Sequence, residues 1–168
     1  VSKHFEDIKI KFVEDSDNHL KIVAEPFDRG YGVTVGNALR RTLMTSVPGA
    51  AITSIKIEGV QHEFSSINGV LEDVSDIILN MKEVIFKTIN DGPEQINLSL
   101  KGPMEFKAKD IGNLLNDFEI LNPNHLIATL NDKATLNIDI RVSRGKGYYA
   151  ASKNKRSDDV IGTIPLDS

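Results

Sequence analysis

The stretch Glu25-Pro-Phe-Asp-Arg-Gly-Tyr-Gly-Val-Thr-Val-Gly-Asn-Ala-Leu-Arg-Arg-Thr-Leu-Met-Thr-Ser-Val-Pro-Gly49 contains the strongest structural signal of this chain. It predicts a short helix that begins near Thr34, whose hydroxyl can accept hydrogen bonds from first-turn amides. Pro48 and Gly49 predict the end of the helix, because proline cannot continue it and glycine tolerates a following turn. Apolar residues recur between these signals at three- and four-residue spacing. They predict one buried stripe, formed by Val35, Ala38, Leu39 and Leu43.

A second face of the same helix combines positive charge with a methionine. Arg40, Arg41 and Met44 fall together on this face. Arginine and methionine are enriched at the cores of protein interfaces, so the face suits a protein partner better than a substrate. A solvated basic helix end with a half-buried methionine explains the same pattern. The residues alone leave both interpretations open.

The whole stretch resembles the signature of the bacterial RNA polymerase alpha-subunit family, in its amino-terminal domain. In that family, Glu-Pro-(Leu/Phe)-(Glu/Asp)-Arg-Gly-(Phe/Tyr)-Gly leads into Gly-Asn-Ala-Leu-Arg-Arg and ends in Pro-Gly. Similar motifs continue in order at residues 57–64, 69–82, 122–129 and 144–152. Several motifs in register are far more specific than any one of them.

The resemblance implies a divided architecture. Residues 1–48 match the first part of a discontinuous dimerisation domain, and residues 49–165 match an inserted, strand-rich α+β domain that contacts the large subunits. Residues 166–168 match the start of the segment that returns to the dimerisation domain. The rest of that segment, and the DNA-binding carboxy-terminal domain of the family, lie outside this sequence.

Local patterns independently favour an α+β fold with few helices. Alternation predicts strands at residues 8–12 and 20–24, a turn at 15–18 between them, and a strand at 52–57. An amphipathic helix is expected at residues 70–81, capped by Asn68 or Ser66, with Glu72, Asp73, Ser75, Asp76 and Asn80 facing water. Further strands are expected at 84–89, 96–100, 104–108, 118–121, 126–130 and 136–142, and one helical turn at 111–115.

Composition excludes several classes of protein. The 168 residues suffice for one domain, or for one domain and part of another. The absence of cysteine excludes thiol catalysis, disulfides and cysteine metal sites. The net charge of −4 disfavours a chain that grips nucleic acid over its whole surface. No apolar run approaches the roughly 20 residues of a membrane span, and no secretory pattern opens the chain.

No pattern in the sequence predicts an active site. The histidines are scattered and show no ligand spacing for a metal. His62 beside Glu63 looks like an acid–base couple, but neighbouring strand residues point to opposite faces. The glycines before the first helix lack dinucleotide spacing, and Asp158 with Asp159 is too little for a magnesium site. By the resemblance, nucleotidyl transfer and its magnesium belong to the large subunits, so no cofactor is expected here.

The resemblance also implies a set of subunit contacts. Arg41 and Met44 match positions that contact β, and His62 and Glu63 lie in a loop used near β. Lys82 and Leu166 match positions implicated in contact with β′. For Lys82, compensation of the helix dipole by a solvated charge remains an alternative role. For Arg40, the alternative is pairing with a residue of the same chain. A second alpha subunit is expected along the dimer helix, through Asn37, Leu39, Arg40 and Leu43.

The expected function is therefore a non-catalytic assembly subunit of a cytoplasmic, nucleoid-associated DNA-directed RNA polymerase, which touches DNA only through the complex. A competing interpretation is a nucleic-acid-binding module at residues 141–156, a basic stretch interleaved with Tyr148 and Tyr149. This stretch contains Arg141, Arg144, Lys146, Tyr148, Tyr149, Lys153, Lys155 and Arg156. An unrelated small enzyme would need a pocket that the sequence does not reveal.

Overall fold

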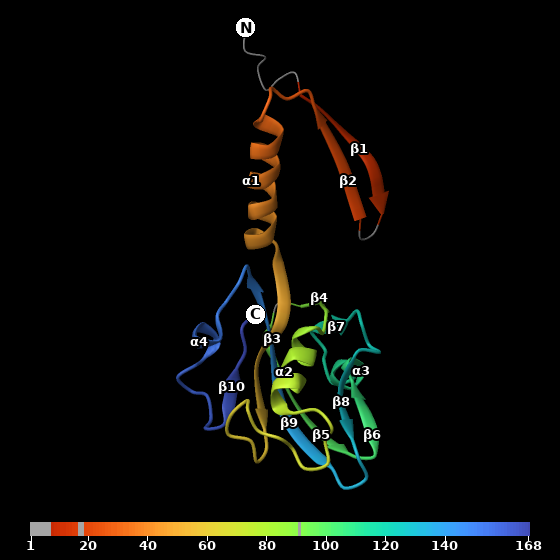
Figure 1. The fold of residues 1–168 in the computed structure, drawn as a ribbon, viewed down its shortest axis with the longest axis vertical. Coiled ribbons are helices and arrows are strands. Elements are labelled where there is room, and N and C mark those ends of the chain that lie inside the picture. The colour runs from red at the N-terminus through yellow and green to blue at the C-terminus, as the bar shows by residue number, and fades with distance from the viewer. Residues whose placement is uncertain (1–7, 17–18, 91) are drawn as a thin grey trace. The chain divides into compact units, whose positions relative to one another are not determined.

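The computed structural model describes residues 8–16, 19–90 and 92–168, and the chain divides into two compact units. The first unit extends to Thr45, and the second runs from Ser46 to Ser168. The sequence-based boundary, between residues 48 and 49, lies slightly later along the chain. Figure 1 labels the elements of both units.

The first unit consists of a hairpin and a helix. Strands β1 (Lys9–Ser16) and β2 (His19–Glu25) pair antiparallel, as their alternation predicts, with a register shift between Phe12 and Glu14. The predicted turn at 15–18 is too long at its start, because Asp15 and Ser16 still pair with β2. The rest of that turn, residues 17 and 18, lies outside the described residues.

Helix α1 (Tyr31–Ser46) begins earlier than its sequence signals indicate. Thr34 lies inside the first turn, where its hydroxyl donates to the Gly30 carbonyl at 3.2 Å instead of accepting from exposed amides. The predicted cap at Thr34 is therefore wrong. Gly30 has φ of +86°, a conformation that glycine adopts without strain, and the chain turns there into the helix. The predicted end is confirmed, since α1 stops at Ser46 and Pro48 opens the next strand.

A four-stranded antiparallel sheet organises the second unit, in the order β10-β3-β9-β5. Its strands are β3 (Pro48–Ile57), β5 (Glu94–Lys101), β9 (Thr135–Lys146) and β10 (Thr163–Pro165). Alternation in β9 is confirmed: every second residue from Leu136 to Val142 is buried. β10 was missed because three residues are too few to show a period.

Helix α2 (Val74–Lys82) is shorter than predicted. Its N-cap is Asp73, whose side chain accepts a hydrogen bond from Asp76 N at 2.9 Å, so neither Asn68 nor Ser66 caps it. Val70 instead forms an isolated bridge with Leu130. Glu72 is not a water-facing helical residue either, because it reaches Thr129 in strand β8 (Leu126–Leu130).

Two small sheets and two short helices complete the unit. β4 (Phe86–Thr88) pairs with β7 (Phe118–Ile120), and β6 (Met104–Lys107) pairs with β8. Helix α3 (Ala108–Gly112) lies close to the predicted helical turn, whereas α4 (Ala151–Asn154) was not predicted. The α+β fold class is confirmed.

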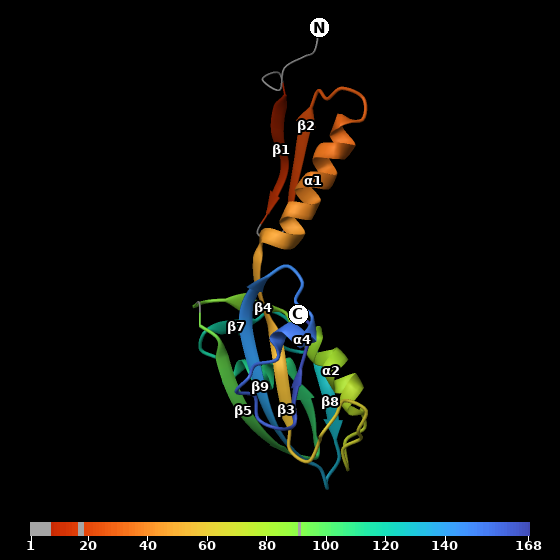
Figure 2. The same ribbon diagram turned by 90° about the vertical axis from the view of Figure 1, so that its left-hand side faces the viewer.

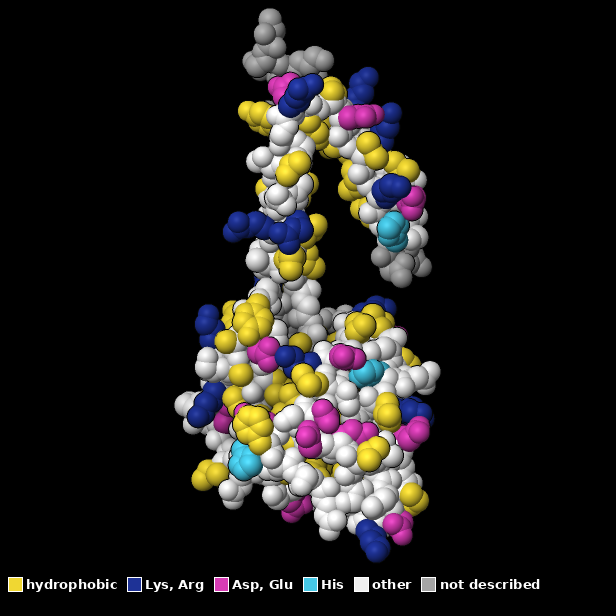
Figure 3. All heavy atoms as spheres, viewed as in Figure 1, with side chains coloured by type: hydrophobic (Ala, Val, Ile, Leu, Met, Phe, Trp, Pro, Cys, Tyr) yellow, Lys and Arg dark blue, Asp and Glu magenta, His cyan; other side chains and the backbone are white. Residues whose placement is uncertain are grey.

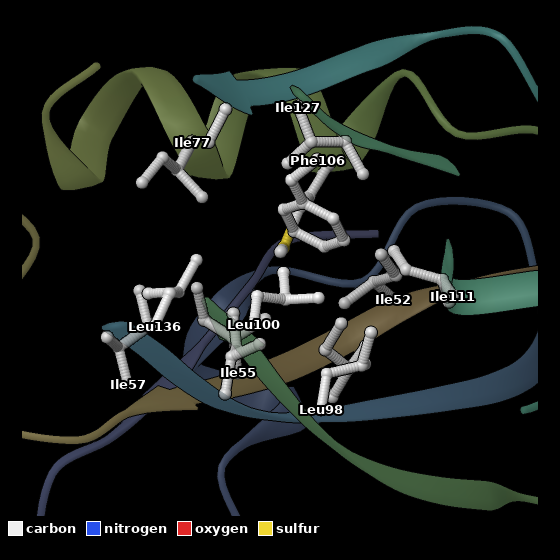
Figure 4. Close-up of a cluster of buried hydrophobic side chains, with 14 of the residues drawn as sticks. Ile52, Ile55, Ile57, Ile77, Leu98, Leu100, Phe106, Ile111, Ile127 and Leu136 are labelled. Carbon is white, nitrogen blue, oxygen red and sulfur yellow. The ribbon is translucent and has the colours of Figure 1, made fainter. Parts of the chain in front are cut away.

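The hydrophobic core lies between the main sheet and a second layer formed by α2 and β8 (Figure 2). Figure 4 shows side chains of β3, β5 and β9 pointing toward those of α2 and β8. Ile77 of α2, Ile127 of β8 and Phe106 of β6, the strand that pairs with β8, face the main sheet and are fully buried. Burying such a side chain contributes about 1.5–3 kcal/mol, so the packing of these two layers stabilises the unit.

Asn131 occupies a confined position between two glycines. Its backbone N–H donates to the Gly69 carbonyl at 2.8 Å, and its side chain accepts from Lys133 N at 2.9 Å. A Cβ at Gly102 would overlap the Asn131 carbonyl, and one at Gly69 would approach the Asn131 side chain to 2.6 Å. Gly69 also has φ of +83°. Both sites therefore require glycine.

Candidate subunit-contact surfaces

The apolar stripe of α1 is exposed rather than buried. Leu39 and Leu43 are 59% and 61% exposed, and Val35 is only half-buried. The predicted burial is wrong for this chain because no described residue of the first unit is buried, so nothing covers the helix. Yellow and dark-blue side chains accordingly lie at the surface of α1 in Figure 3.

The two arginines on the second face of α1 differ in their contacts. Arg40 Nη1 donates to Met44 Sδ at 3.4 Å, one turn along the helix, and Met44 is 67% exposed. Arg41 is exposed and its guanidinium makes no hydrogen bond or ion pair with the described residues. Arg41 therefore offers a planar set of donors that are not used within this part of the chain.

His62 and Glu63 lie in the loop between β3 and α2 and are both exposed. His62 Nδ1 lies 3.3 Å from Ser65 Oγ, while the Glu63 carbonyl accepts from Ser75 Oγ at 2.8 Å. The loop is thus fastened to the start of α2. Phe64 follows them and is 81% exposed, which extends the loop surface with an aromatic ring.

Lys82 and Leu166 have opposite environments. Lys82 Nζ donates to both carboxylate oxygens of Asp167, at 2.8 and 2.9 Å, with a third of its side chain exposed. Leu166 belongs to the hydrophobic core and is 3% exposed. The buried Leu166 side chain therefore cannot contact a partner in this structure. The next residue, Asp167, is accessible.

Some basic side chains of residues 141–156 interact with other residues of this chain. Arg141 is not an exposed cation, as the nucleic-acid interpretation requires, but forms an ion pair with Asp159 at 2.9 Å. Lys153 Nζ lies 5.9 Å from the centroid of the Tyr149 ring, within cation–π range. The expected continuous basic surface is therefore interrupted at its first residue.

The described residues contain no group of three or more His, Cys, Asp or Glu side chains arranged to hold a metal ion. His125 has a structural role, since its Nε2 lies 2.8 Å from the Asn80 carbonyl at the end of α2. None of the described helices has the length and apolar character needed to cross a membrane.

The chain is similar to known proteins over most of its length. Residues 55–168 match the model of the RNA polymerase Rpb3/RpoA insert domain. The chain belongs to this family. A DNA-directed RNA polymerase subunit alpha from Chloroherpeton thalassium is 52% identical over 97% of the chain and 50% of the relative. The subunit from Limosilactobacillus reuteri is 50% identical over 98% of the chain and 52% of the relative.

A third relative of the same name, from Desulfitobacterium hafniense, is 51% identical over 95% of the chain and 51% of its own length. The chain thus spans about half the length of these relatives. The matched insert domain includes β9 and β10 and the helix α2, whereas α1 lies before it. The family match therefore covers the part of the second unit that carries Lys82 and Asp167. The similarity to the three relatives extends over nearly all of this chain, so it also includes α1.

Two residues at these surfaces have no local sequence signal. Asp167 meets Lys82 across 85 positions of the chain, and Tyr148 lies near the same carboxylate. Neither residue belongs to a motif whose spacing indicates this meeting. Only the pairing of β10 with β3 brings the C-terminal residues back to the end of α2.

Proposed function

We propose that this chain is the assembly portion of an alpha-type subunit of a DNA-directed RNA polymerase, where it dimerises and seats the β and β′ subunits. The observation that carries the proposal is the identity of 50–52%, over nearly all of the chain, to proteins named as that subunit. The exposed faces of α1 support it physically, because large apolar side chains in a row on a surface mark interaction sites.

The second copy of the chain occupies the apolar stripe of α1 in this proposal. The same unit exposes Phe12 and Ile10 on its hairpin, at 67% and 64%. A two-fold dimer would let each helix cover the other. Sedimentation of the chain should show a monomer–dimer balance that Leu43→Glu shifts to monomer. Leu71→Glu, at an exposed leucine of the second unit, is the matched control and should leave the balance unchanged.

Binding to β rests on Arg41 and Met44, assisted by the His62–Glu63 loop. Arg41→Ala should weaken binding to purified β by about 2 kcal/mol, or roughly 30-fold, without unfolding the chain. Arg41→Lys should recover only part of the loss, because lysine cannot reproduce a two-pronged hydrogen bond. Unchanged affinity of Arg41→Ala in a titration would overturn this contact.

The chemistry of transcription belongs to the assembled complex in this proposal, with the active-site magnesium held by the large subunits. The chain alone should then incorporate no nucleotides on a primed template in the presence of magnesium. Incorporation by material free of contaminating polymerase would contradict the assembly role. As part of a bacterial-type polymerase, the chain would act in the cytoplasm, at the nucleoid.

Direct DNA binding by residues 141–156 is the competing function, and it is tested on the same protein. Fluorescence anisotropy with a duplex should show no binding at physiological salt, because Arg141 is committed to Asp159. Binding that weakens steeply as salt rises would instead favour a nucleic-acid module.

A further inference from the structure

Three side chains from distant parts of the second unit meet at the C-terminal end of α2. Lys82 ends the helix, Tyr148 follows β9, and Asp167 follows β10. Asp167 accepts two hydrogen bonds from the Lys82 ammonium, at 2.8 and 2.9 Å, and Tyr148 lies near the same carboxylate. We call this group the Lys82–Tyr148–Asp167 cluster. It stays accessible, with Tyr148 72% exposed.

The backbone around Asp167 is held on both sides. Leu166 N donates to the Thr53 carbonyl at 2.9 Å, and the Leu166 side chain is buried in the core. Ser168 and Tyr149 exchange two backbone hydrogen bonds, at 2.6 and 2.9 Å. Asn154 Nδ2 adds a fourth hydrogen bond, to the Leu166 carbonyl at 2.7 Å. The backbone on both sides of Asp167 is therefore anchored, and the flexible lysine side chain reaches a carboxylate attached to this anchored segment.

We propose that Asp167 is a positioning residue that holds Lys82 ready for contact with β′, with the exposed Tyr148 ring at the edge of the same surface. This inference rests on the proposed function. A lysine has a flexible stem that loses rotamer entropy on binding. A lysine already held by a neighbouring carboxylate loses less, so preorganisation raises affinity. Because Leu166 is buried, β′ would contact this exposed cluster rather than the Leu166 side chain.

The geometry also indicates the chemistry of the complementary surface. An ammonium has three N–H donors, and the Asp167 oxygens accept two hydrogen bonds, which leaves one donor for a partner. The exposed Tyr148 ring presents an apolar face near Asp167. The fitting partner segment therefore offers a carbonyl or carboxylate acceptor next to an apolar side chain. Because the charge of Lys82 is balanced by Asp167, a strongly acidic segment is not required.

The test is a double-mutant cycle measured as affinity of the full chain for purified β′. Lys82→Ala should weaken binding about tenfold, and Asp167→Asn about fivefold, within the range of coupling between touching residues. In the Lys82→Ala background, Asp167→Asn should have almost no further effect. Asp167→Glu, which keeps the charge, should recover part of the affinity. Tyr148→Phe keeps the ring and should cause a smaller loss.

The control is a second exposed ion pair in the same unit. Lys87 Nζ lies 3.3 Å from Glu119 Oε2, and these two residues face each other in the pairing of β4 with β7. Lys87→Ala and Glu119→Gln should leave affinity for β′ unchanged. Melting curves of every variant separate loss of fold from loss of contact, and Asp167→Glu remains informative if Asp167→Asn unfolds.

The outcomes distinguish this inference from the function on which it rests. If the unaltered chain does not bind β′ at all, the proposed function fails. If it binds and Lys82→Ala weakens binding while Asp167→Asn does not, the positioning role is overturned. Equal losses from Asp167→Asn with and without Lys82 would also overturn it, since Asp167 would then act independently of the lysine.

Discussion

Arg141 Nη2 lies 2.9 Å from Asp159 Oδ1, and the two side chains are only 14% and 6% exposed. The second carboxylate oxygen accepts from Arg156 N at 2.8 Å. Arg141 Nη1 is buried and has no hydrogen-bond partner among the described residues. The pair therefore fastens the segment after α4 to β9, and its removal would leave a buried charge uncompensated.

Asp159→Ala should lower the free energy of unfolding by about 3 kcal/mol, because it leaves the buried Arg141 guanidinium unpaired. The measurement is urea unfolding followed by circular dichroism. Asp158→Ala is the matched control, as Asp158 is adjacent and exposed, and should change stability by no more than about 0.5 kcal/mol. Equal small effects from both variants would show that the ion pair adds nothing to stability.

Stability should fall as the solution is acidified. Burial acts to raise the pKa of Asp159, but hydrogen bonds from Arg156 N and the Arg141 side chain outweigh it and lower the pKa. The hydrogen bond from Lys82 is the main cause that lowers the pKa of Asp167. A depressed folded-state pKa contributes stability above the unfolded value of about 3.9, which is lost as pH falls through the folded pKa.

The unfolding free energy should thus decline below about pH 4. Asp159→Asn should be less stable at neutral pH and show a flatter decline. An unaltered acid profile in that variant would contradict the assignment.

Glu72 is expected to stabilise the junction between α2 and β8. Its carboxylate accepts from Thr129 N at 2.6 Å and from the Thr129 hydroxyl at 3.0 Å. Glu72→Ala should cost about 2 kcal/mol, since it leaves a part-buried N–H without its charged acceptor. Thermal unfolding measures the effect, and Glu119→Ala, at an exposed pair, should cost less than half as much. A stable Glu72→Ala variant would mean that water replaces the carboxylate at no cost.

Leu166→Ala should destabilise the second unit by about 2–5 kcal/mol, because it opens a cavity in the core. Ile161→Ala, at a side chain that is 95% exposed, should be nearly neutral. Chemical denaturation of both variants decides whether Leu166 is a core residue or a surface contact. A neutral Leu166→Ala with reduced β′ binding would restore the contact that the family resemblance implies.

Hydrogen exchange should be slow in β9 and α2 and much faster in α1. β9 pairs on both sides, with β3 and β5, and α2 packs Val74, Ile77 and Met81 into the core. No residue of α1 is buried. Exchange rates measured at several concentrations test this expectation. Strong protection of α1 at low concentration would show that a second copy already covers it.

Short-range patterns predicted most of the strands, and their failures follow from tertiary context. The alternation of β9 is visible because one face is buried and the other is polar. In α2 the apolar residues Val70 and Leu71 extend the helical period by chance, while Asp73 supplies the actual cap. The stripe of α1 has the right spacing for burial, but spacing cannot show whether the covering surface is in the same chain.

The predicted roles of Arg41, Met44, His62, Glu63 and Lys82 came from the family resemblance rather than from local patterns, and they stay predictions. The sequence could not indicate the partners of Lys82, since Asp167 reaches it only after β10 pairs with β3. Arg141 and Asp159 are likewise brought together by a loop whose course no periodicity describes. Long-range pairs of this kind depend on the completed fold.

The confinement of Asn131 between Gly69 and Gly102 affects how a mutational survey of this protein should be interpreted. Almost any substitution at either glycine would reduce the amount of folded protein, and assays of growth or transcription would score both positions as essential. Neither belongs to the proposed contact surfaces. Separating abundance from binding in such a survey would keep these two steric constraints from being mistaken for a fourth partner site.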